Sequence, residues 1–217
     1  KTLADNLALM IEKQGLETAI SQVDRSGQTL FSRYIERNDY YDLFLLDAEG
    51  YCFYSVTEEA DYQTNLVSGQ FKDSGLGEVV QKAILDSQYH MSDLAPYAPS
   101  NGDPAAFIAA PVMLQGELVM ILAMQLSMGG IDTIMSERTG LGDTGETYLV
   151  GADLLMRSNS YLDPVNHSVE GSFANPELGK VDTKAVQQAG LGNIGSQIVI
   201  DYNGNPVLSA YSPLTLH

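Results

Sequence analysis

Residues 140–160 read GLGDTGETYLVGADLLMRSNS, and the glycines in this stretch decide how the chain is organised. The first three glycines have the G-x-G-x-x-G spacing of a dinucleotide-binding turn, which requires a strand before the glycines and a helix after them. Here the order is reversed, because residues 128–135 have helical apolar spacing and the apolar run 147–150 indicates a buried strand. A helix that ends near Gly140 presents carbonyl groups to the loop and repels phosphate. The stretch therefore favours a linker between two modules over a nucleotide site.

The composition describes a globular, acidic protein. The chain has 217 residues, 44% of them hydrophobic, which is enough for one large or two small cores. Twenty-eight Asp and Glu residues against eleven Lys and Arg give a formal charge of -17, which repels nucleic acid and anionic lipid alike. We therefore expect neither as a partner.

Cys52 is the single cysteine, so no internal disulfide forms, and its apolar surroundings in the sequence predict a buried thiol. No stretch approaches the roughly 20 apolar residues of a membrane span, and the residues from Lys1 onward do not have the pattern of a signal peptide. Because the chain does not begin with Met, we expect it to be part of a longer protein.

Residues 3–35 carry apolar side chains mostly three and four residues apart, which predicts one long amphipathic helix. Gly15 and Gly27 weaken it by about 1 kcal/mol each relative to alanine. A helix of about 33 residues spans about 50 Å, enough to run the height of two small stacked modules.

Residues 38–127 predict a first module with the order strand, strand, short helix, strand, strand. Turns at 48–50 and at Gln115-Gly116 each join two apolar runs into a hairpin. The short helix is expected at 75–85, with Asp73 or Ser74 as its N-cap, and an extra strand at 89–94. The paired runs are 41–47 with 51–57, and 105–114 with 117–127.

The second half repeats this pattern in reduced form. Residues 145–158 predict a strand, an acidic turn and a strand, and a loop at 159–180 and a short helix at 181–188 follow. Residues 196–214 predict a hairpin that turns at Asn203-Gly204. The chain stops at His217, where a last strand is expected, so we expect a second module that is truncated at its C-terminus.

Four stretches of this sequence carry a resemblance to a known family. They are DLFLLDAEGYCFYSVTEEADYQTNL (42–66), FKDSGLGEVVQKA (71–83), PYAPSNGDPAAFIAAPV (96–112) and GLGDTGETYLVGADLLMRSNS (140–160). Together they resemble the double-Cache extracytoplasmic sensor domains of bacterial transmembrane receptors, which include chemoreceptors and sensor histidine kinases. In that family the glycine-rich turn joins a membrane-distal module to a membrane-proximal one.

The resemblance implies an α+β chain in which a long N-terminal helix precedes two PAS-like modules with central antiparallel sheets. It also implies membrane spans outside this sequence, ligand capture usually in the distal module, and a homodimer formed through the N-terminal helix. The expected divisions are the helix at 1–37, the distal module at 38–127, a linker helix and glycine-rich turn at 128–144, and the proximal module at 145–217.

Catalysis has little support in the sequence. His90, His167 and His217 are far apart, and none has the spacing of a metal pair or of a nucleophile's base. The acidic residues Glu58, Glu59 and Asp61 lack the alternation and glycine of an EF-hand, so they are interpreted as a solvated face. We expect no enzyme activity, metal or cofactor.

A binding pocket in the first module is the better hypothesis. Residues 89–107 combine aromatic side chains, hydrogen-bonding groups and prolines, and a small polar ligand needs an apolar wall with a few placed donors and acceptors. In a PAS-like module this segment and the regions of Tyr54 and Phe71 converge on one face of the sheet. Each aromatic is also a core candidate. The expected ligand-binding residues are Tyr54, Phe71, Asp73, Tyr89, Tyr97, Asn101, Asp103 and Phe107.

Family members that bind amino acids carry an aromatic and arginine signature with a tryptophan before the helix, followed later by an aspartate for the ammonium group. This chain has no tryptophan, and residues 71–73 stand near where the signature would lie. Asp93 or Asp103 remains an ammonium partner, and amines and small carboxylates stay open as ligands. In the second module Tyr148, Arg157 and Ser158 are anion candidates, although Arg157 can equally pair with a neighbouring carboxylate.

The sequence therefore predicts the periplasmic sensor domain of a bacterial transmembrane receptor, which detects a small molecule and passes a conformational signal across the membrane. The alternative is a soluble periplasmic module that binds a small molecule or another protein and has no signalling output.

Overall fold

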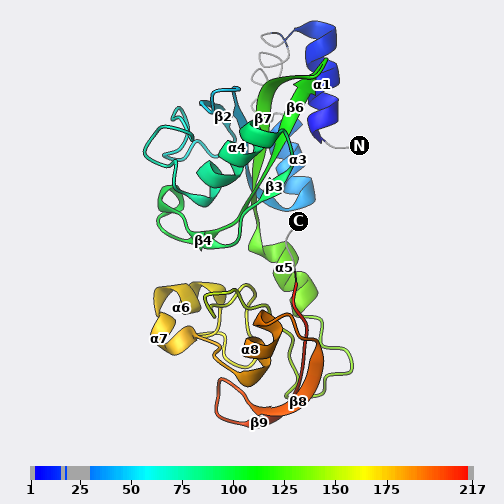
Figure 1. Ribbon diagram of the computed structural model, residues 1–217, viewed down its shortest axis with the longest axis vertical. Helices are drawn as coiled ribbons and strands as arrows, with labels where there is room; N and C mark the ends of the chain where they lie inside the picture. The colour runs from blue at the N-terminus through cyan, green and yellow to red at the C-terminus, as the bar shows by residue number, and fades with distance from the viewer. Residues whose placement is uncertain (1–2, 16–17, 19–29, 215–217) are drawn as a thin grey trace. The chain divides into compact units, whose positions relative to one another are not determined.

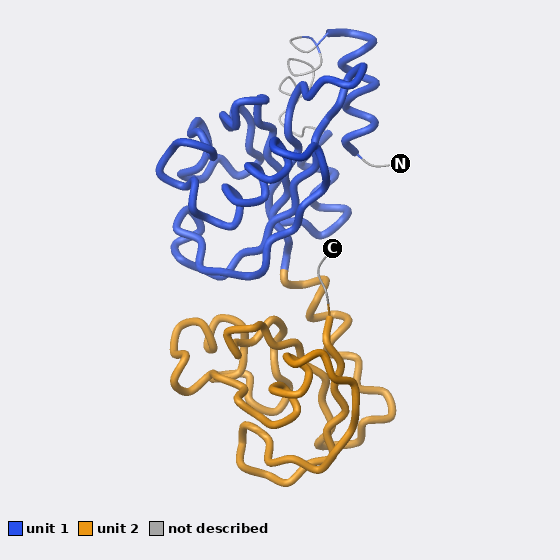
Figure 2. Tube along the Cα trace, in the orientation of Figure 1, with its two compact units in different colours: residues 1–127, 217 blue, residues 128–216 orange. Residues whose placement is uncertain are grey.

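The computed structural model describes residues 3–15, 18 and 30–214. The chain divides into two compact units, unit 1 (residues 1–127 and 217) and unit 2 (residues 128–216), coloured separately in Figure 2. Helices and strands are mixed, and unit 1 is built on a central antiparallel sheet. The predicted α+β class with a central antiparallel sheet is confirmed.

The sheet of unit 1 has five strands in the order β2-β1-β7-β6-β3, and every pairing is antiparallel. The predicted hairpins form, and Gln115 and Gly116 turn β6 into β7 with φ angles of 52° and 88°. Two left-handed residues in a two-residue loop match the right-handed twist of the flanking strands. The strands are β1 (Tyr40–Leu46), β2 (Cys52–Ser55), β3 (His90–Met91), β6 (Phe107–Leu114) and β7 (Glu117–Leu126).

Helix α4 (Gly75–Asp86) covers one face of this sheet. It begins at Ser74, one of the two predicted N-caps, whose hydroxyl accepts a hydrogen bond from the Gly77 amide at 3.2 Å. The apolar side of α4 packs on Phe44, Phe107 and the buried Cys52. Cys52 is completely buried, which confirms the predicted buried thiol. This burial raises the pKa of the thiol to about 12.

Helices α1 (Leu3–Gln14) and α3 (Leu30–Asn38) cover the opposite face, as Figure 1 shows. Helix α1 buries Ala4, Leu7 and Ile11 there, at the helical spacing seen in the sequence. Phe31 of α3 is completely buried against the same face. The sheet is therefore apolar on both sides.

The prediction of one continuous helix over residues 3–35 is wrong. Helix α1 ends at Gln14, because Gly15 has a left-handed φ of 77° and donates its amide to the Ile11 carbonyl, a usual glycine helix stop. Both α1 and α3 pack within unit 1, so neither runs along two modules. The second predicted weak point, Gly27, lies outside the described residues.

A short irregular segment joins α4 to β6. It contains β4 (Ala95–Pro96), the 3₁₀ turn η1 (Ala98–Ser100) and β5 (Pro104–Ala105), and β4 pairs with β5. β3 begins within the predicted 89–94 strand but is only two residues long. This segment delivers Tyr97 and Ser100 to the α4 face of the sheet, where both are buried.

Unit 2 consists of α5 followed by short helices and one hairpin, in which β8 and β9 pair antiparallel. Helix α5 ends at Met135, earlier than the predicted end at Gly140. The expected helix near 181–188 is α8, with Thr183 as its N-cap. The elements are α5 (Met128–Met135), α6 (Val169–Ala174), α7 (Pro176–Gly179), α8 (Lys184–Gly190), β8 (Gly195–Ile200) and β9 (Pro206–Tyr211).

The predicted hairpin at 145–158 is wrong as a regular pair of strands, because only Val150 and Met156 form an isolated bridge. The Leu149 amide donates to the Ser158 hydroxyl at 2.9 Å instead of to a backbone carbonyl, which interrupts the ladder. The loop predicted at 159–180 is also wrong, since it contains α6 and α7. Ser168 caps α6, and Pro176 is the first residue of α7.

One face of the β8–β9 hairpin is apolar and exposed. Ile198 and Leu208 are cross-strand partners, and their exposed fractions are 77% and 78%. The inner face carries Val199, which is 6% exposed.

None of the described helices combines the length and apolar composition that a membrane crossing requires.

Helix α4 offers a matched test of the core. Leu76 is completely buried and Leu85, on the same helix, is 87% exposed. We expect Leu76→Ala to lower the free energy of unfolding by about 2–5 kcal/mol through lost burial and a residual cavity. The control Leu85→Ala should change it by less than about 0.5 kcal/mol. Urea titration measures both, and equal effects would contradict the proposed core.

Candidate functional site

The α4 face of the sheet contains polar side chains at one end. Asp42 of β1 and Gln125 of β7 are paired across the two strands, and Gln125 is in turn paired with Phe107 of β6. Directly opposed residues in a sheet place their side chains on the same face. Asp42 is completely buried and Gln125 is 5% exposed, so two polar groups extend the row of Phe44 and Ala123.

The Asp42 carboxylate is held by the backbone and side chains that follow β2. Ser55 and Thr57 donate their hydroxyls to Oδ2 at 2.8 and 2.6 Å, while the amides of Leu43, Val56 and Thr57 donate to Oδ1. These bonds favour the ionised carboxylate, although burial is the larger effect and raises the pKa of Asp42. Asp42 therefore has little capacity left for a further partner.

Asp61 is also completely buried, but only one of its two carboxylate oxygens accepts a hydrogen bond. Its Oδ2 accepts a hydrogen bond from the Tyr97 hydroxyl, which comes from the segment between α4 and β6. Its Oδ1 has no hydrogen-bond partner among the described residues. Buried carboxylate oxygens normally accept several hydrogen bonds, so Oδ1 is an open acceptor.

A second open acceptor is the Oε1 atom of Gln125, which also has no partner among the described residues. Its Nε2 donates to the Ser100 hydroxyl at 3.4 Å, and Ser100 donates to Glu59 at 2.8 Å. Glu59 also accepts from the Tyr41 hydroxyl at 2.8 Å. We call Asp42, Glu59, Asp61, Tyr97, Ser100 and Gln125 together the acidic cluster.

The charges of the acidic cluster act on one another. Burial, followed by the charges of Asp42 and Glu59, raises the pKa of Asp61 to about 6, although the Tyr97 hydrogen bond lowers it in part. Burial and the Asp61 charge raise the pKa of Tyr97 far above its ordinary value, so Tyr97 stays a neutral donor. In the described residues no ion pair with Lys, Arg or His neutralises these carboxylates.

Three of the residues predicted from sequence lie at this face. Tyr97 and Phe107 meet edge to face at 4.6 Å between ring centroids, and Phe71 is half-buried against the same core. Phe107 packs on Phe44 as well, at 6.3 Å. Tyr97 thus combines a core ring with a hydroxyl in the acidic cluster.

The other five predicted residues do not converge there. Tyr54 lies on the opposite face, against Phe31 of α3 at 5.5 Å, so its expected position beside Tyr97 is wrong. Tyr54 pairs with Leu45, whose side chain packs on that same face. A register shift between Leu45 and Leu46 then places Cys52 on the α4 face. The remaining side chains are exposed: Asp73, Tyr89, Asn101 and Asp103.

Asp42, Asp61 and Gln125 were missed as site residues. The interpretation of Asp61 as part of a solvated face is wrong, because Tyr97, 36 positions further along the chain, buries it and donates to it. The available signal was a polar residue inside each of two apolar strands, Asp42 in YDLFLL and Gln125 in MILAMQL. Such residues are costly in a buried strand unless they are paired or functional.

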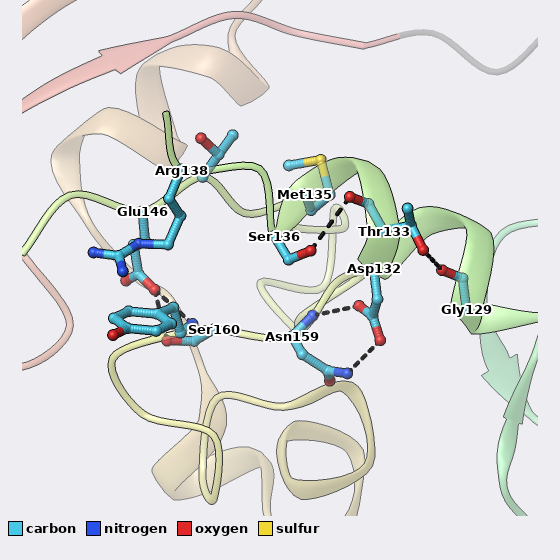
Figure 3. A pocket seen from close by; sticks show the side chains of 11 residues that line it. Gly129, Asp132, Thr133, Met135, Ser136, Arg138, Glu146, Asn159 and Ser160 are labelled. Atoms are coloured by element: carbon cyan, nitrogen blue, oxygen red, sulfur yellow. Dashed lines mark hydrogen bonds between the residues drawn. The ribbon is translucent and has the colours of Figure 1, made fainter. Parts of the chain in front are cut away.

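Unit 2 has a cavity of its own, with a volume of about 380 Å³, shown in Figure 3. Asp132 of α5 accepts from the amide and the side chain of Asn159, and Glu146 accepts from Ser160. Arg138 donates to the carbonyls of three residues of the glycine-rich turn and stacks on Tyr161 at 3.5 Å. The charged groups in this cavity are thus held by neighbours in unit 2.

The anion candidates of the second half are structural in this fold. Arg157 is 9% exposed and pairs with Asp153 at 3.0 Å, which is the alternative that the sequence left open. Ser158 is completely buried and accepts from Leu149, and Tyr148 packs against Tyr202. Within the described ranges, no group of three or more His, Cys, Asp or Glu is arranged to hold a metal ion.

No protein-family model and no curated protein matches the sequence. Solved structures do match at the level of fold. The extracellular ligand binding receptor from Desulfohalobium retbaense DSM5692 has a TM-score of 0.57 at 14% identity, over 98% of this chain and 34% of that one. The ligand-binding domain of the Campylobacter jejuni chemoreceptor Tlp3, in complex with 4-methylisoleucine, has a TM-score of 0.55 at 12% identity, over 88% of this chain and 69% of that one.

The ligand-binding domain of the Pseudomonas aeruginosa PAO1 amino acid chemoreceptor PctC, in complex with GABA, has a TM-score of 0.53 at 15% identity, over 93% of this chain and 78% of that one. The extracellular domain of the putative histidine kinase mmHK1S-Z2 also matches, with a TM-score of 0.51 at 15% identity. The chain therefore has the fold of chemoreceptor and histidine kinase sensor domains, and the resemblance predicted from sequence is confirmed in fold.

The raised pKa of Asp61 has a measurable consequence for stability. Its native pKa of about 6 lies above the ordinary aspartate value of about 3.9. Between these values the native state binds more protons than the unfolded state, so the free energy of unfolding should fall as the pH rises from about 4 to about 6. The expected loss is of order 2 kcal/mol. Asp61→Asn should flatten this dependence.

The control for that measurement is Asp39→Asn, which removes the same charge from an exposed, left-handed position that asparagine tolerates. It should keep the parent dependence. Denaturant titrations at several pH values measure all three proteins, and an unchanged slope in Asp61→Asn would refute the assignment.

Proposed function

We propose that this chain is the ligand-binding domain of a bacterial signalling receptor, and that its ligand is a small molecule with a positively charged nitrogen. The observation that carries the proposal is the pair of open, buried acceptors, Asp61 Oδ1 and Gln125 Oε1, in a cluster of carboxylates. The binding site in this proposal is the acidic cluster of unit 1.

The reasoning starts from the cost of burial. A buried polar atom without a hydrogen bond costs about 1–3 kcal/mol, and a buried carboxylate without a counter-charge costs more. An ammonium group supplies three N–H donors and one positive charge, so a single such group has enough donors for both acceptors and supplies the counter-charge of Asp61. A neutral ligand can donate to both acceptors, but it leaves the negative charge of Asp61 without a counter-charge.

The residues of the site have separate roles in this proposal. Asp61 accepts from the ammonium and provides the counter-charge, and Gln125 provides the second acceptor. Tyr97 orients the Asp61 carboxylate through its hydroxyl, while its ring and Phe107 form the apolar wall. Binding signals only if the ligand prefers one of two conformations of the domain. Tyr97 and Ser100 lie in the segment between α4 and β6, so contraction around the ligand moves that segment.

The ligands named for two structures of the same fold, GABA and 4-methylisoleucine, both carry an amino group. They support a nitrogen-bearing ligand by analogy alone. We extend the proposal to two PAS-like modules, a distal one at 38–127 and a proximal one at 145–217, joined by residues 128–144. A periplasmic location, membrane spans outside this sequence and transmission across the membrane complete it.

A homodimer through the N-terminal helix is part of the same proposal. Helix α1 buries one side against the sheet of unit 1, and Leu9 on its outer side is 49% exposed. A partner helix on that outer side is the arrangement we propose for the full-length receptor.

The proposal predicts binding that depends on Asp61. We expect isothermal titration calorimetry at pH 8 with primary amines and amino acids to give at least one ligand with a Kd below 1 mM. Asp61→Asn should weaken that ligand by roughly 10–100-fold, the usual value of a charge-assisted hydrogen bond, and Gln125→Ala by about 10-fold. Asp39→Asn should bind like the parent. Circular dichroism establishes that each variant is folded, and retained affinity in folded Asp61→Asn would reject the site.

Binding should also release protons near pH 6. The native pKa of Asp61 is about 6, so a cation that requires the ionised carboxylate displaces part of a proton at that pH and almost none at pH 8. Titration of one ligand in two buffers of different ionisation enthalpy measures the number of protons released. A release that is equal at both pH values, or that persists in Asp61→Asn, would place the cation elsewhere.

A further inference from the structure

We infer that the ligand of the acidic cluster is an organic amine that carries no carboxylate group. The inference rests on the proposed function and narrows it, because amino acids and amines both supply the ammonium group. It follows from the supply of donors and cations around the cluster and not from the ammonium site itself.

Most hydrogen-bond donors of the cluster are already in use. The Tyr97 hydroxyl donates to Asp61, the Ser100 hydroxyl to Glu59, and the Gln125 amide nitrogen to Ser100, which leaves one N–H of Gln125. The atoms that have no partner among the described residues, Asp61 Oδ1 and Gln125 Oε1, are both acceptors, and both belong to side chains that are at least nine-tenths buried. A ligand carboxylate needs several donors, so the cluster suits an ammonium group better than a carboxylate.

The Lys and Arg residues that the structure describes in unit 1 lie elsewhere. Lys13 is on α1, and Arg33 and Arg37 are on α3, which cover the opposite face of the sheet. On the α4 side Lys82 pairs with Glu78 at 2.5 Å on the solvent side of the helix, with half of each side chain exposed. Lys72 is exposed in the loop before α4. Lys1 and Arg25 lie outside the described residues.

The start of α4 does not replace a cation. A helix N-terminus attracts anions through its free amides, but Ser74 already accepts from the Gly77 amide. Glu78 places a negative charge in the first turn of the same helix. A ligand carboxylate at the start of α4 would be repelled by Glu78, and a carboxylate in the acidic cluster would be repelled by Asp42, Glu59 and Asp61.

The rest of the ligand is expected to be apolar. The Tyr97 hydroxyl contacts Asp61, the Tyr97 ring packs on Phe107, and Phe107 packs on Phe44. Cys52 lies in the same buried core and carries a neutral thiol. An alkyl or arylalkyl amine buries its carbon chain against these side chains and directs its ammonium group to Asp61.

The experiment compares pairs of compounds that differ only by one carboxylate: cadaverine with lysine, isobutylamine with valine, phenethylamine with phenylalanine, and propylamine with GABA. Calorimetry of the full chain at pH 8 measures the Kd of each. We expect at least one amine to bind, and every amine that binds to do so at least 10-fold more tightly than its carboxylated partner. We expect Asp61→Asn to weaken that amine and Lys72→Ala to leave it unchanged.

The two levels of the proposal fail in different ways. An amino acid that binds as tightly as its amine, and that loses affinity in Asp61→Asn, overturns the amine assignment and leaves the proposed function intact. If that amino acid also weakens in Lys72→Ala, Lys72 is its carboxylate partner. Absence of binding below 1 mM for all eight compounds rejects the amine assignment and the proposed ammonium site together.

Discussion

The burial of both faces of one sheet is the constraint on which unit 1 depends. Helix α4 covers one face and α1 with α3 covers the other, so the strands between them have almost no place for polar side chains. Asp42 and Gln125 are exceptions, and their pairing across β1 and β7 puts them in the same row. The interior tolerates Asp42 because three amides and two hydroxyls hold it. Asp61 has no such shell among the described residues, and this difference is the reason for proposing Asp61, and not Asp42, as the carboxylate that binds the ligand.

Most of unit 1 was predictable because local signals and tertiary packing agree there. Apolar runs indicated the strands, the Gln115-Gly116 turn indicated the second hairpin, and Ser74, one of two N-cap candidates, indicated the start of α4. Helix α1 lies within the predicted N-terminal helix, and Leu7 and Ile11, two of the apolar positions whose spacing predicted it, are buried. The predicted continuity of that helix was wrong, because a glycine inside a helical pattern can lie within the helix or end it, and only its φ angle decides.

The candidate site was less accessible from sequence, for a physical reason. Tyr97 was selected because an aromatic among prolines and polar residues is typical of a pocket, and the same residue is a core residue here. Asp61 reads as a member of a polar, acidic run, and its burial depends on a tyrosine far away in the chain. In unit 2 the Leu149 amide donates to the Ser158 hydroxyl and not to a backbone carbonyl of a neighbouring strand. The apolar pattern of the sequence does not reveal such a side-chain hydrogen bond.

Because of its position, Cys52 can report on the opening of the core of unit 1. It is the single thiol of the chain, it is completely buried under α4, and its raised pKa keeps it unreactive while that packing persists. Alkylation of Cys52 therefore requires the packing around it to open, and the rate of labelling reports on these openings. Because Cys52 lies in the same core as Tyr97, labelling rates with and without a ligand would report whether a ligand of the proposed site reduces these openings, without a dye or an engineered probe.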